Sequence, residues 1–386
     1  MNQRSSYTSS SSLAFGWRFA PLLVIAAWMI ASLAAIDVFI NFAFSYPRDP
    51  KVLTPTRLQQ YFEYGRSAEG ALRRMTRPDP AATAPITLAG WYDPLVATQW
   101  GVSGQVPLTA KPEKPVVTIY GASHSVRLAA ALGRVSKDLI SRSVGAPGAT
   151  PNWSYGAYLR DRGGGASVAV VLTFNANELA MINSFSPSIW SGDFPMPYAG
   201  DRFYVEGGEL KTIRPPYDSF KSYQQTFFDP KAWSAAVEFF ARNDPLYDAF
   251  SFRANLLDYS ALARLVRRAY NQDHTRANLH AVLDKSGFHP ESQGVQLARA
   301  LIHAFTTQAR ADGMIPVIYL VNNLGYSDFL FRALKPALDA DKVVYVSSHT
   351  LVSPSDPNAY LPDSHFTDVN DNRLATALAE AIKAAK

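Results

Sequence analysis

Short apolar runs alternate with segments of helical spacing through most of the chain after Pro115. Runs rich in β-branched residues between amphipathic helices are typical of a parallel sheet that helices cover on both faces. The pattern therefore predicts an α/β fold, in which ligands bind at the carboxyl ends of the strands. The expected strands are 116–120, 167–174, 315–321 and 342–347, and the expected helices are 125–134, a broken stretch across 230–270, 291–312 and 370–385.

The first expected strand ends in a turn that carries two serines and a histidine. The stretch reads VVTIYGASHSVRLAAAL, from Val116 to Leu132, and its apolar run stops at Gly121 before a helix begins. A buried strand that ends in this way delivers a side chain to the edge of the sheet where chemistry takes place. Ser123 is a candidate nucleophile if the chain also supplies a base, a group that orients the base, and donors for an oxyanion.

A long apolar stretch lies near the N-terminus. Residues 19–36 carry no charge, and the apolar character resumes after Asp37 and continues to residue 44, which is long enough for a membrane-spanning helix. A cleaved signal peptide is the alternative, because small residues at 31–35 offer a cleavage site. The apolar residues beyond that site favour an uncut anchor. Basic residues flank both ends of the stretch, so their distribution does not decide its orientation.

These features predict the organisation of the chain. We expect a short cytoplasmic segment at 1–18, a transmembrane anchor at 19–44, and a linker with a local helical piece at 45–114. One large domain at 115–386 would then face the periplasm or the outside of the inner (cytoplasmic) membrane, because a lone N-terminal anchor usually exports the domain that follows it.

Residues 183–228 interrupt the alternation of strands and helices and are rich in Pro, Gly and aromatic side chains. One interpretation is a surface excursion packed by its own rings. The other is a lid in which some rings stack on a sugar or an acyl chain. The candidate rings are Trp190, Tyr198, Phe203, Tyr204 and Tyr217, of which Trp190 and Tyr198 are the expected substrate contacts.

Composition excludes several classes of protein. The 386 residues are 47% hydrophobic and 18% charged, which is ordinary for a folded core. The net charge of +5 is not gathered into a basic stripe, so nucleic acid is not an expected partner. The absence of cysteine excludes disulfides, thiol catalysis and cysteine-ligated zinc. No metal-ligand spacing and no phosphate-binding glycine loop is present, so we expect neither a metal nor another cofactor.

The candidate base lies close to the C-terminus, in YLPDSHFTDVNDNRLATALAEAI. Asp363 stands two residues before His365, and a carboxylate at that spacing can fix the tautomer of the ring while the other nitrogen faces a serine. The same residues are also common in a turn at the start of a helix. Candidate oxyanion donors are Gly148, in SVGAPGATPN, and Asn177, in LTFNANEL.

Together these four segments occur in the order found in the SGNH (GDSL-like) hydrolase superfamily, which the chain resembles. YGASHS stands in the place of the family's Gly-Asp-Ser turn, NANE resembles its Gly-x-Asn-Asp block, and DSHFTDVNDNRLA resembles its last block. The resemblance covers roughly residues 115–180 and 340–386. It implies a three-layer α/β/α sandwich with a mostly parallel sheet, Ser123 as nucleophile, His365 as base, Asp363 as its orienting carboxylate, and Gly148 and Asn177 in the oxyanion hole.

The chain departs from the family pattern at three points. Ala122 replaces the aspartate of the first block, Asn175 replaces the glycine of the third, and the Asp–His spacing is two residues where three is commoner. An Asp-x-His followed by an aromatic residue is similar to the envelope-anchored branch that includes alginate-type O-acetyltransferases. In several members of that branch, however, the Asp/His pair precedes the serine.

The sequence offers three other candidates for the reacting groups, and each is less favourable. Ser125 lies one turn into the helix and is expected to point away from the strand end, and His124 is expected to line the pocket rather than act on its neighbour. Asp284 and His289 form a second Asp–His pattern, which precedes another expected strand instead of ending the domain. The remaining histidines were interpreted as structural residues without partners: His274, His280, His303 and His349.

The sequence thus predicts a membrane-anchored serine esterase or O-acyltransferase. The expected substrate is an O-acyl, chiefly O-acetyl, ester of an envelope or exported polysaccharide, with a membrane-bound acyltransferase as a possible partner. The alternative is a catalytically silent scaffold subunit of a polysaccharide-modifying complex, which the altered first block keeps open.

Overall fold

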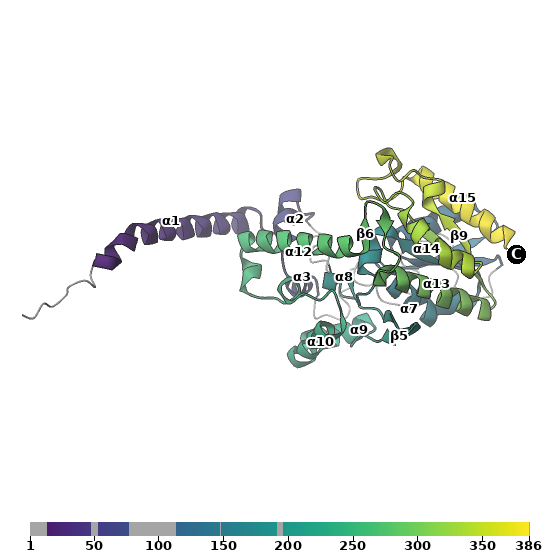
Figure 1. The fold of residues 1–386 in the computed structure, drawn as a ribbon, viewed down its shortest axis with the longest axis horizontal. Helices are drawn as coiled ribbons and strands as arrows, with labels where there is room; N and C mark the ends of the chain where they lie inside the picture. The colour runs from purple at the N-terminus through teal and green to yellow at the C-terminus, as the bar shows by residue number, and fades with distance from the viewer. Residues whose placement is uncertain (1–13, 48–52, 77–112, 147, 191–195, 386) are drawn as a thin grey trace, which may run out of the picture.

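The computed structural model describes residues 14–47, 53–76, 113–146, 148–190 and 196–385 (Figure 1). Much of the expected linker therefore lies outside the described residues. The remainder of that linker forms two short helices, α2 (Arg57–Glu63) and α3 (Ala68–Met75).

A five-stranded sheet, in which every pair of neighbours is parallel, forms the centre of the molecule. The expected α/β class with a mostly parallel sheet is therefore confirmed. The strand order is β2-β1-β3-β8-β9, so the chain leaves β1 toward one edge and then crosses back to continue on the other side. Ligands bind at such a reversal point in open α/β sheets, here between β1 and β3. The strands are β1 (Val116–Gly121), β2 (Ile140–Gly145), β3 (Ser167–Asn175), β8 (Ile315–Val321) and β9 (Val344–Ser347).

Strand β2 was not among the expected strands, because its sequence ISRSVG carries no apolar run. It nevertheless pairs with β1 along its whole length, from Ile140 beside Val116 to Gly145 beside Gly121. The buried guanidinium of Arg142 forms two hydrogen bonds of 2.5 Å with Asp161. The carboxylate is at the end of the following helix, α7 (Pro151–Asp161), so the strand's own pattern does not reveal that the charge of Arg142 is compensated.

Helices cover both faces of the sheet, and alternate strand residues point into two separate apolar clusters. On one face Ile119 and Val171 pack with α6 (Ser123–Val135) and α15 (Asp368–Ala384). On the other face Tyr120 and Leu172 join the cluster built by α7 (Pro151–Asp161), α13 (Gln293–Ala311) and α14 (Phe329–Ala340). The candidate site residues Ser123, Gly148 and Asn177 follow three neighbouring strands at one edge of this sheet.

The described rings of the segment 183–228 pack mostly against other elements, so the expectation of a surface excursion packed by its own rings is corrected. Phe203 and Tyr217 are buried, and Phe203 lies edge-on against Tyr155 with 4.9 Å between ring centroids. The segment contains α8 (Pro187–Trp190), the hairpin β4 (Arg202–Glu206) and β5 (Glu209–Ile213), and α9 (Phe220–Phe228). It leads into α10 (Pro230–Asn243) and α11 (Ala249–Phe252). The shorter remaining elements are η1 (Arg162–Gly165), η2 (Ala176–Met181), η3 (Leu256–Tyr259), β6 (Leu283–Asp284), β7 (Gly287–Phe288), η4 (Ser348–Thr350) and η5 (Pro357–Ala359).

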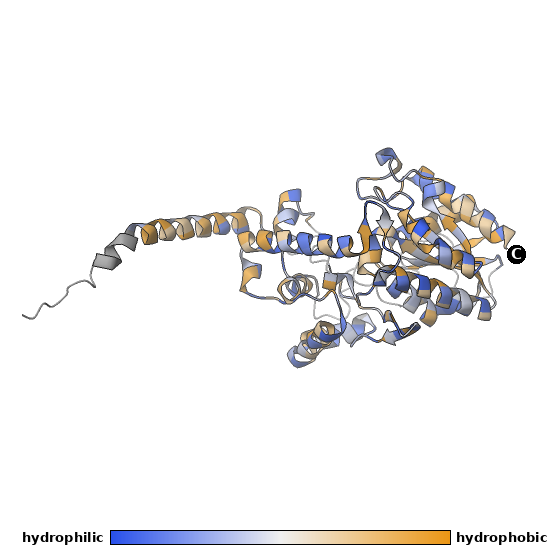
Figure 2. Ribbon diagram, in the orientation of Figure 1, coloured by the Kyte–Doolittle hydropathy of each residue, from blue (hydrophilic) through white to orange (hydrophobic). Residues whose placement is uncertain are grey.

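Helix α1 (Ala14–Ala43) projects from the rest of the molecule, and its described surface is apolar (Figure 2). Its part from Pro21 to Ala43 is long and apolar enough to span a membrane, and none of it is buried within the protein. The end of α1 is attached to α12 (Ala261–Val282): Asp37 Oδ1 accepts hydrogen bonds from Ser260 Oγ at 2.9 Å and from the Leu262 backbone N–H at 2.8 Å. Asp37, the single charge that interrupts the apolar stretch, therefore helps to cap a helix of the globular part.

Candidate functional site

Ser123 is the first residue of α6 and follows directly after the carboxyl end of β1. The turn is tight because Gly121 has no side chain: a Cβ at this position would lie 1.9 Å from Ser125 Oγ and 2.8 Å from Thr173 Cβ. The first hydrogen bond of the turn is donated by the Ser125 N–H to the Ala122 carbonyl. The N–H groups of Ser123 and of the residue after it therefore belong to the unpaired first turn, at the positive end of a 13-residue helix.

Ser125 does not compete for the role of nucleophile. Its hydroxyl is buried and donates a 2.8 Å hydrogen bond to Thr173 Oγ1 on β3. The bond fastens α6 to the neighbouring strand and uses the proton that a base would have to remove. As expected, the Ser125 side chain points away from the reacting edge.

His365 reaches the serine from the loop before α15. Its Nε2 lies 2.7 Å from Ser123 Oγ, and its Nδ1 lies 3.0 Å from Asp363 Oδ2. The His365 backbone N–H also donates to Asp363 Oδ1 at 3.2 Å. The structure thus brings the three expected catalytic side chains into one chain of contacts. In the tautomer with hydrogen on Nδ1, the ring donates to Asp363 and accepts the serine proton at Nε2.

A short closed loop holds this histidine in place. The Leu361 N–H donates to the His365 carbonyl at 2.7 Å, and Tyr360 and Phe366 form an antiparallel bridge on either side. Ser364 takes a positive φ of 69°, which allows Asp363 and His365 to face each other across only two residues. The unusual spacing seen in the sequence is therefore accommodated by the backbone of one residue.

Asp363 is far more exposed than His365, with 66% of its side chain accessible against 22% for the histidine. Partial burial raises the pKa of Asp363, but the hydrogen bonds from the His365 ring and backbone outweigh it and hold that pKa below its usual range. The carboxylate is therefore ionised at neutral pH and able to accept the Nδ1 proton.

Arg127, which the sequence analysis did not single out, connects the serine helix to the histidine loop. It lies one turn after Ser123, and its guanidinium donates to the Phe366 carbonyl at 3.0 Å and to Asp371 at 2.8 Å. A further contact of 2.9 Å joins it to Asp368. An arginine on the surface of an amphipathic helix gives no sequence signal for this role, because its partners lie more than 230 positions away.

His124 is buried beside the catalytic ring. The centroids of the His124 and His365 rings are 4.8 Å apart, and Phe366 packs against the other side at 5.1 Å. Burial, followed by the neighbouring His365 and Arg127, lowers the pKa of His124 to about 3. The ring is therefore neutral at physiological pH, and its Nδ1 has no partner among the described residues. It packs next to His365, and its expected place in the lining of a substrate pocket stays a prediction.

Gly148 and Asn177 follow the two strands that flank β1, so the three segments meet at the same edge of the sheet. Gly148 has a positive φ of 66° and lies in the loop between β2 and α7. Asn177 is exposed in η2, where its backbone N–H donates to Asn323 Oδ1 at 3.3 Å. The two expected oxyanion residues therefore follow the strands on either side of β1, no direct contact to Ser123 is found for either among the described residues, and their role stays a prediction.

The two aromatic residues expected to bind substrate differ in placement. Tyr198 is fully buried, with its ring 5.9 Å from that of Trp153, so the expectation that it stacks on a substrate is corrected: it belongs to the core. Trp190 is half-buried, and its Nε1 has no acceptor among the described residues. It ends α8, whose Pro187 lies 3.6 Å from the position of a Gly148 Cβ. Trp190 therefore remains a candidate at the rim of the site.

A buried carboxyl group lies next to the Asn177 loop and was missed by the sequence analysis. Glu178 Oε1 accepts a 2.7 Å hydrogen bond from Asn175 Nδ2. Burial raises the pKa of Glu178 to about 8, although the bond from Asn175 lowers it. An uncharged carboxyl group therefore lies just after β3, at the same edge of the sheet as Ser123. In the sequence, only the glutamate of NANE indicates it.

The second Asp–His pattern also forms a pair, but it does not resemble a reacting site. His289 Nε2 lies 3.1 Å from Asp284 Oδ2, and its Nδ1 lies 3.3 Å from the Ala281 carbonyl oxygen. Both ring nitrogens are engaged, so neither is directed at a serine.

The expectation that the other histidines have no partners is wrong for two of them. His303 Nδ1 lies 2.7 Å from Asp341 Oδ1, and His349 Nδ1 lies 2.8 Å from Ser347 Oγ. Both act as local hydrogen-bonding groups on the surface of the sheet-and-helix layers. Within the described ranges, no group of three or more His, Asp or Glu side chains is arranged to hold a metal ion.

No protein-family model matches the chain, and no curated protein matches its sequence.

Proposed function

We propose that this chain is a membrane-anchored serine esterase or O-acyltransferase with an SGNH-like three-layer α/β/α domain. The observation that carries the proposal is the chain of contacts from Ser123 Oγ to His365 Nε2, at 2.7 Å, and from His365 Nδ1 to Asp363, at 3.0 Å. An isolated serine is a poor nucleophile, and this arrangement supplies the base and the group that orients it.

The reaction follows from the atoms in contact. Ser123 Oγ attacks the carbonyl carbon of an ester while its proton passes to His365 Nε2, and the Nδ1–H bond to Asp363 stabilises the imidazolium that forms. The tetrahedral intermediate collapses with loss of the alcohol, which takes the proton from Nε2. The acyl group then remains on Ser123 until water or a sugar hydroxyl attacks it, with His365 again acting as the base.

The oxyanion would be held at the start of α6. We propose the backbone N–H groups of Ser123 and Gly148 and the side-chain amide of Asn177 as donors, because their loops follow three adjacent parallel strands. The positive end of α6 favours negative charge at the same place. His124 and Trp190 would border the substrate.

The proposed substrate is an O-acyl, chiefly O-acetyl, ester on an envelope or exported polysaccharide. It is supported by the anchor, which restricts the enzyme to a membrane surface, by an aromatic side chain at the rim, and by the resemblance to envelope O-acetyltransferases. Hydrolysis and transfer share the acyl-enzyme and differ in whether water is excluded from it. A membrane-bound acyltransferase partner would be the source of acyl groups for transfer.

The test is labelling of the full-length chain, in detergent micelles, with a fluorophosphonate probe that modifies activated serines. We expect labelling of the wild-type chain and none of Ser123→Ala. The His365→Ala variant should label about 100- to 10,000-fold more slowly, because it lacks the general base. The matched control is Ser125→Ala, which removes a serine two positions away and should label normally.

Turnover of a small acetyl ester gives the second measurement. Release of acetate that requires Ser123 and His365 would support the enzyme, and acetylated oligosaccharide formed when a glycan is added would indicate transfer. A folded wild-type chain that is neither labelled nor active would overturn the proposal in favour of the silent scaffold.

A further inference from the structure

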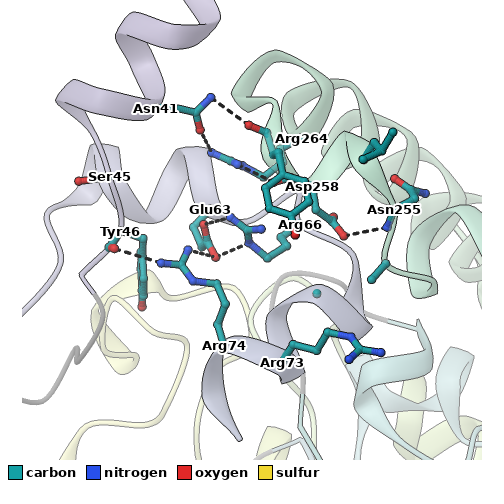
Figure 3. Close-up of a pocket in the computed structure, with 14 residues that line it drawn as sticks. Asn41, Ser45, Tyr46, Glu63, Arg66, Arg73, Arg74, Asn255, Asp258 and Arg264 are labelled. Carbon is teal, nitrogen blue, oxygen red and sulfur yellow. Dashed lines mark hydrogen bonds and ion pairs between the residues drawn. The ribbon is translucent and has the colours of Figure 1, made fainter. Parts of the chain in front are cut away.

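A cavity lies outside the serine site, at the end of the apolar helix α1. Its volume is about 900 Å³, and it is enclosed by the end of α1 with the residues after it, by α2 and α3, and by the segment from η3 to the start of α12 (Figure 3). Four arginines line it: Arg66, Arg73, Arg74 and Arg264. We call it the arginine cavity.

Positive charge in the arginine cavity exceeds the negative charge that faces it. Glu63 accepts hydrogen bonds from both Arg66, at 2.6 Å, and Arg74, at 2.7 Å, so one carboxylate is shared by two guanidinium groups (Figure 3). Arg264 donates instead to neutral oxygens, among them the Phe62 carbonyl at 2.7 Å and Asn41 Oδ1 at 3.0 Å. Of these three arginines, two share the carboxylate of Glu63, and the side chain of Arg264 is hydrogen-bonded to neutral oxygens only.

The other acidic groups nearby are already engaged. Asp258, which also lines the cavity, forms a 2.5 Å contact with the buried Arg267. Glu69 is bonded to Arg73 and to the indole N–H of Trp233. Asp37 lies near Arg264 but is occupied in capping α12. Burial and the charge of Arg66 lower the pKa of Arg264, as expected where positive charge is in excess.

Two of the arginines remain accessible to a ligand. The side chain of Arg73 is 55% exposed and that of Arg74 is 34% exposed. A planar guanidinium presents paired N–H donors that match the oxygens of a phosphate group. In Figure 3 the Arg74 guanidinium points toward Tyr46 and Glu63, whereas that of Arg73 points away from them, so the two arginines offer donors in different parts of the cavity.

The position of the cavity relates it to a membrane surface. Asn41, in the last turn of α1, is one of its walls, and Asn41 Nδ2 donates to the Tyr259 carbonyl at 3.2 Å. On the rim, Leu256 is 85% exposed and Tyr259 is 77% exposed, and neither packs into the core. Exposed leucine and tyrosine side chains beside the end of a spanning helix are suited to the level of the lipid headgroups. The charged cavity therefore opens where phosphate groups of lipids are concentrated.

We propose that the arginine cavity binds the phosphodiester headgroup of an anionic phospholipid, from the leaflet in which α1 ends. This inference rests on the anchor part of the proposed function and is independent of the serine chemistry. The lipid would fix the globular part against the surface in addition to the contacts of Asp37, and its acyl chains would lie beside Leu256 and Tyr259.

The test uses the full-length chain in uncharged detergent micelles and follows its thermal unfolding as lipid is added. We expect phosphatidylglycerol to raise the unfolding midpoint in a saturable way, whereas phosphatidylcholine and inorganic phosphate have little effect. The double variant Arg73→Gln/Arg74→Gln should require about tenfold or more phosphatidylglycerol for half of the effect, since each lost charge-assisted hydrogen bond costs on this scale.

The matched control is Arg276→Gln on α12, which removes the same charge from a 64% exposed side chain outside the cavity and should behave as the wild type. Arg73→Gln alone leaves the pairing of Arg74 with Glu63 intact and should give an intermediate loss, which guards against misfolding of the double variant. Equal stabilisation by both lipids, an equal effect of inorganic phosphate, or an unchanged response of the Arg73→Gln/Arg74→Gln variant would overturn the inference. Extraction of the chain from membranes by alkaline carbonate would show instead that α1 does not anchor it in the membrane. Fluorophosphonate labelling tests the serine site independently of the arginine cavity.

Discussion

Single residues decide how the edge of the sheet is organised. His124 and Glu178 are both buried and both uncharged near neutral pH, one because its pKa is lowered to about 3 and the other because its pKa is raised to about 8. Beside these two uncharged groups, the exposed Asp363 carries a negative charge. In the acyl transfer that we propose, the low polarity of these surroundings would strengthen the interactions of the charge that develops on His365.

Glu178 provides a prediction at this scale. In the unfolded chain its carboxyl titrates near its ordinary value, and in the folded chain near pH 8, so the folded state binds an additional proton between these values. Its contribution to stability is therefore complete at acidic pH and is lost as the pH rises toward 8, by about 1.4 kcal/mol per pH unit. Glu178→Gln cannot titrate and should remove this loss, so that the variant gains stability relative to the wild type between pH 5 and pH 8.

Denaturant unfolding of both proteins at pH 5, 6, 7 and 8 would measure the difference. Asp244 and Asp371, whose pKa values are raised to about 6, contribute equally to both curves and cancel in it. Parallel curves for the two proteins would contradict the assignment of a raised pKa to Glu178.

At the level of elements, the apolar pattern predicted the strands whose burial is visible in their own sequence. Strand β8 was expected at 315–321 and is found there, because IPVIYLV is a continuous buried run. Strand β2 was missed because its burial depends on Arg142 pairing with Asp161 on another element. The same reason explains the site: Ser123, His365 and Asp363 could be proposed from their order in the chain, whereas Arg127 and Glu178 could not, since their roles depend on tertiary partners.

Arg127 gives the prediction for the contact between α6 and the histidine loop. Arg127→Gln loses the bonds to Asp371 and to the Phe366 carbonyl, and the His365 ring should then no longer be held at 2.7 Å from Ser123. We expect the rate of fluorophosphonate labelling to fall about tenfold or more, on the scale of a lost charge-assisted hydrogen bond. The rate would be measured well below the unfolding temperature of each variant.

Arg134→Gln is the matched control, because Arg134 lies on the same helix and also bonds to α15, through Asn372. It should lose some stability without a change in labelling. Arg127→Lys keeps a positive charge for Asp371 but has no second nitrogen to reach the Phe366 carbonyl. Compared with Arg127→Gln, it should therefore regain more of the lost stability than of the lost labelling rate. Equal losses of rate in the Arg127→Gln and Arg134→Gln variants would show that Arg127 acts only through stability.

At the scale of the whole molecule, one continuous helix, α12, connects the end of α1 to the elements that follow β3. The 22 residues of α12 extend over about 33 Å, from contacts with α1 at its start to contacts with η2, which follows β3 (Figure 1). Asp37 and Asn41 hold the end of α1 to α12 by hydrogen bonds, so α1 is fixed directly to the globular part. This arrangement could not be inferred from the sequence, because the apolar pattern of α1 predicts a span but not what the end of the span contacts.

The orientation of the chain determines which substrates it can meet, and the lack of cysteine makes it measurable. A single cysteine introduced as Lys285→Cys, at an exposed position of the globular part, should react in spheroplasts with a membrane-impermeant maleimide. A cysteine introduced as Ser5→Cys, before the apolar stretch, should react only after lysis. This result would place Ser123 on the side of the membrane where exported polysaccharides are modified. The reverse pattern would place the serine site in the cytoplasm, and an ester on an exported glycan could then not be its substrate.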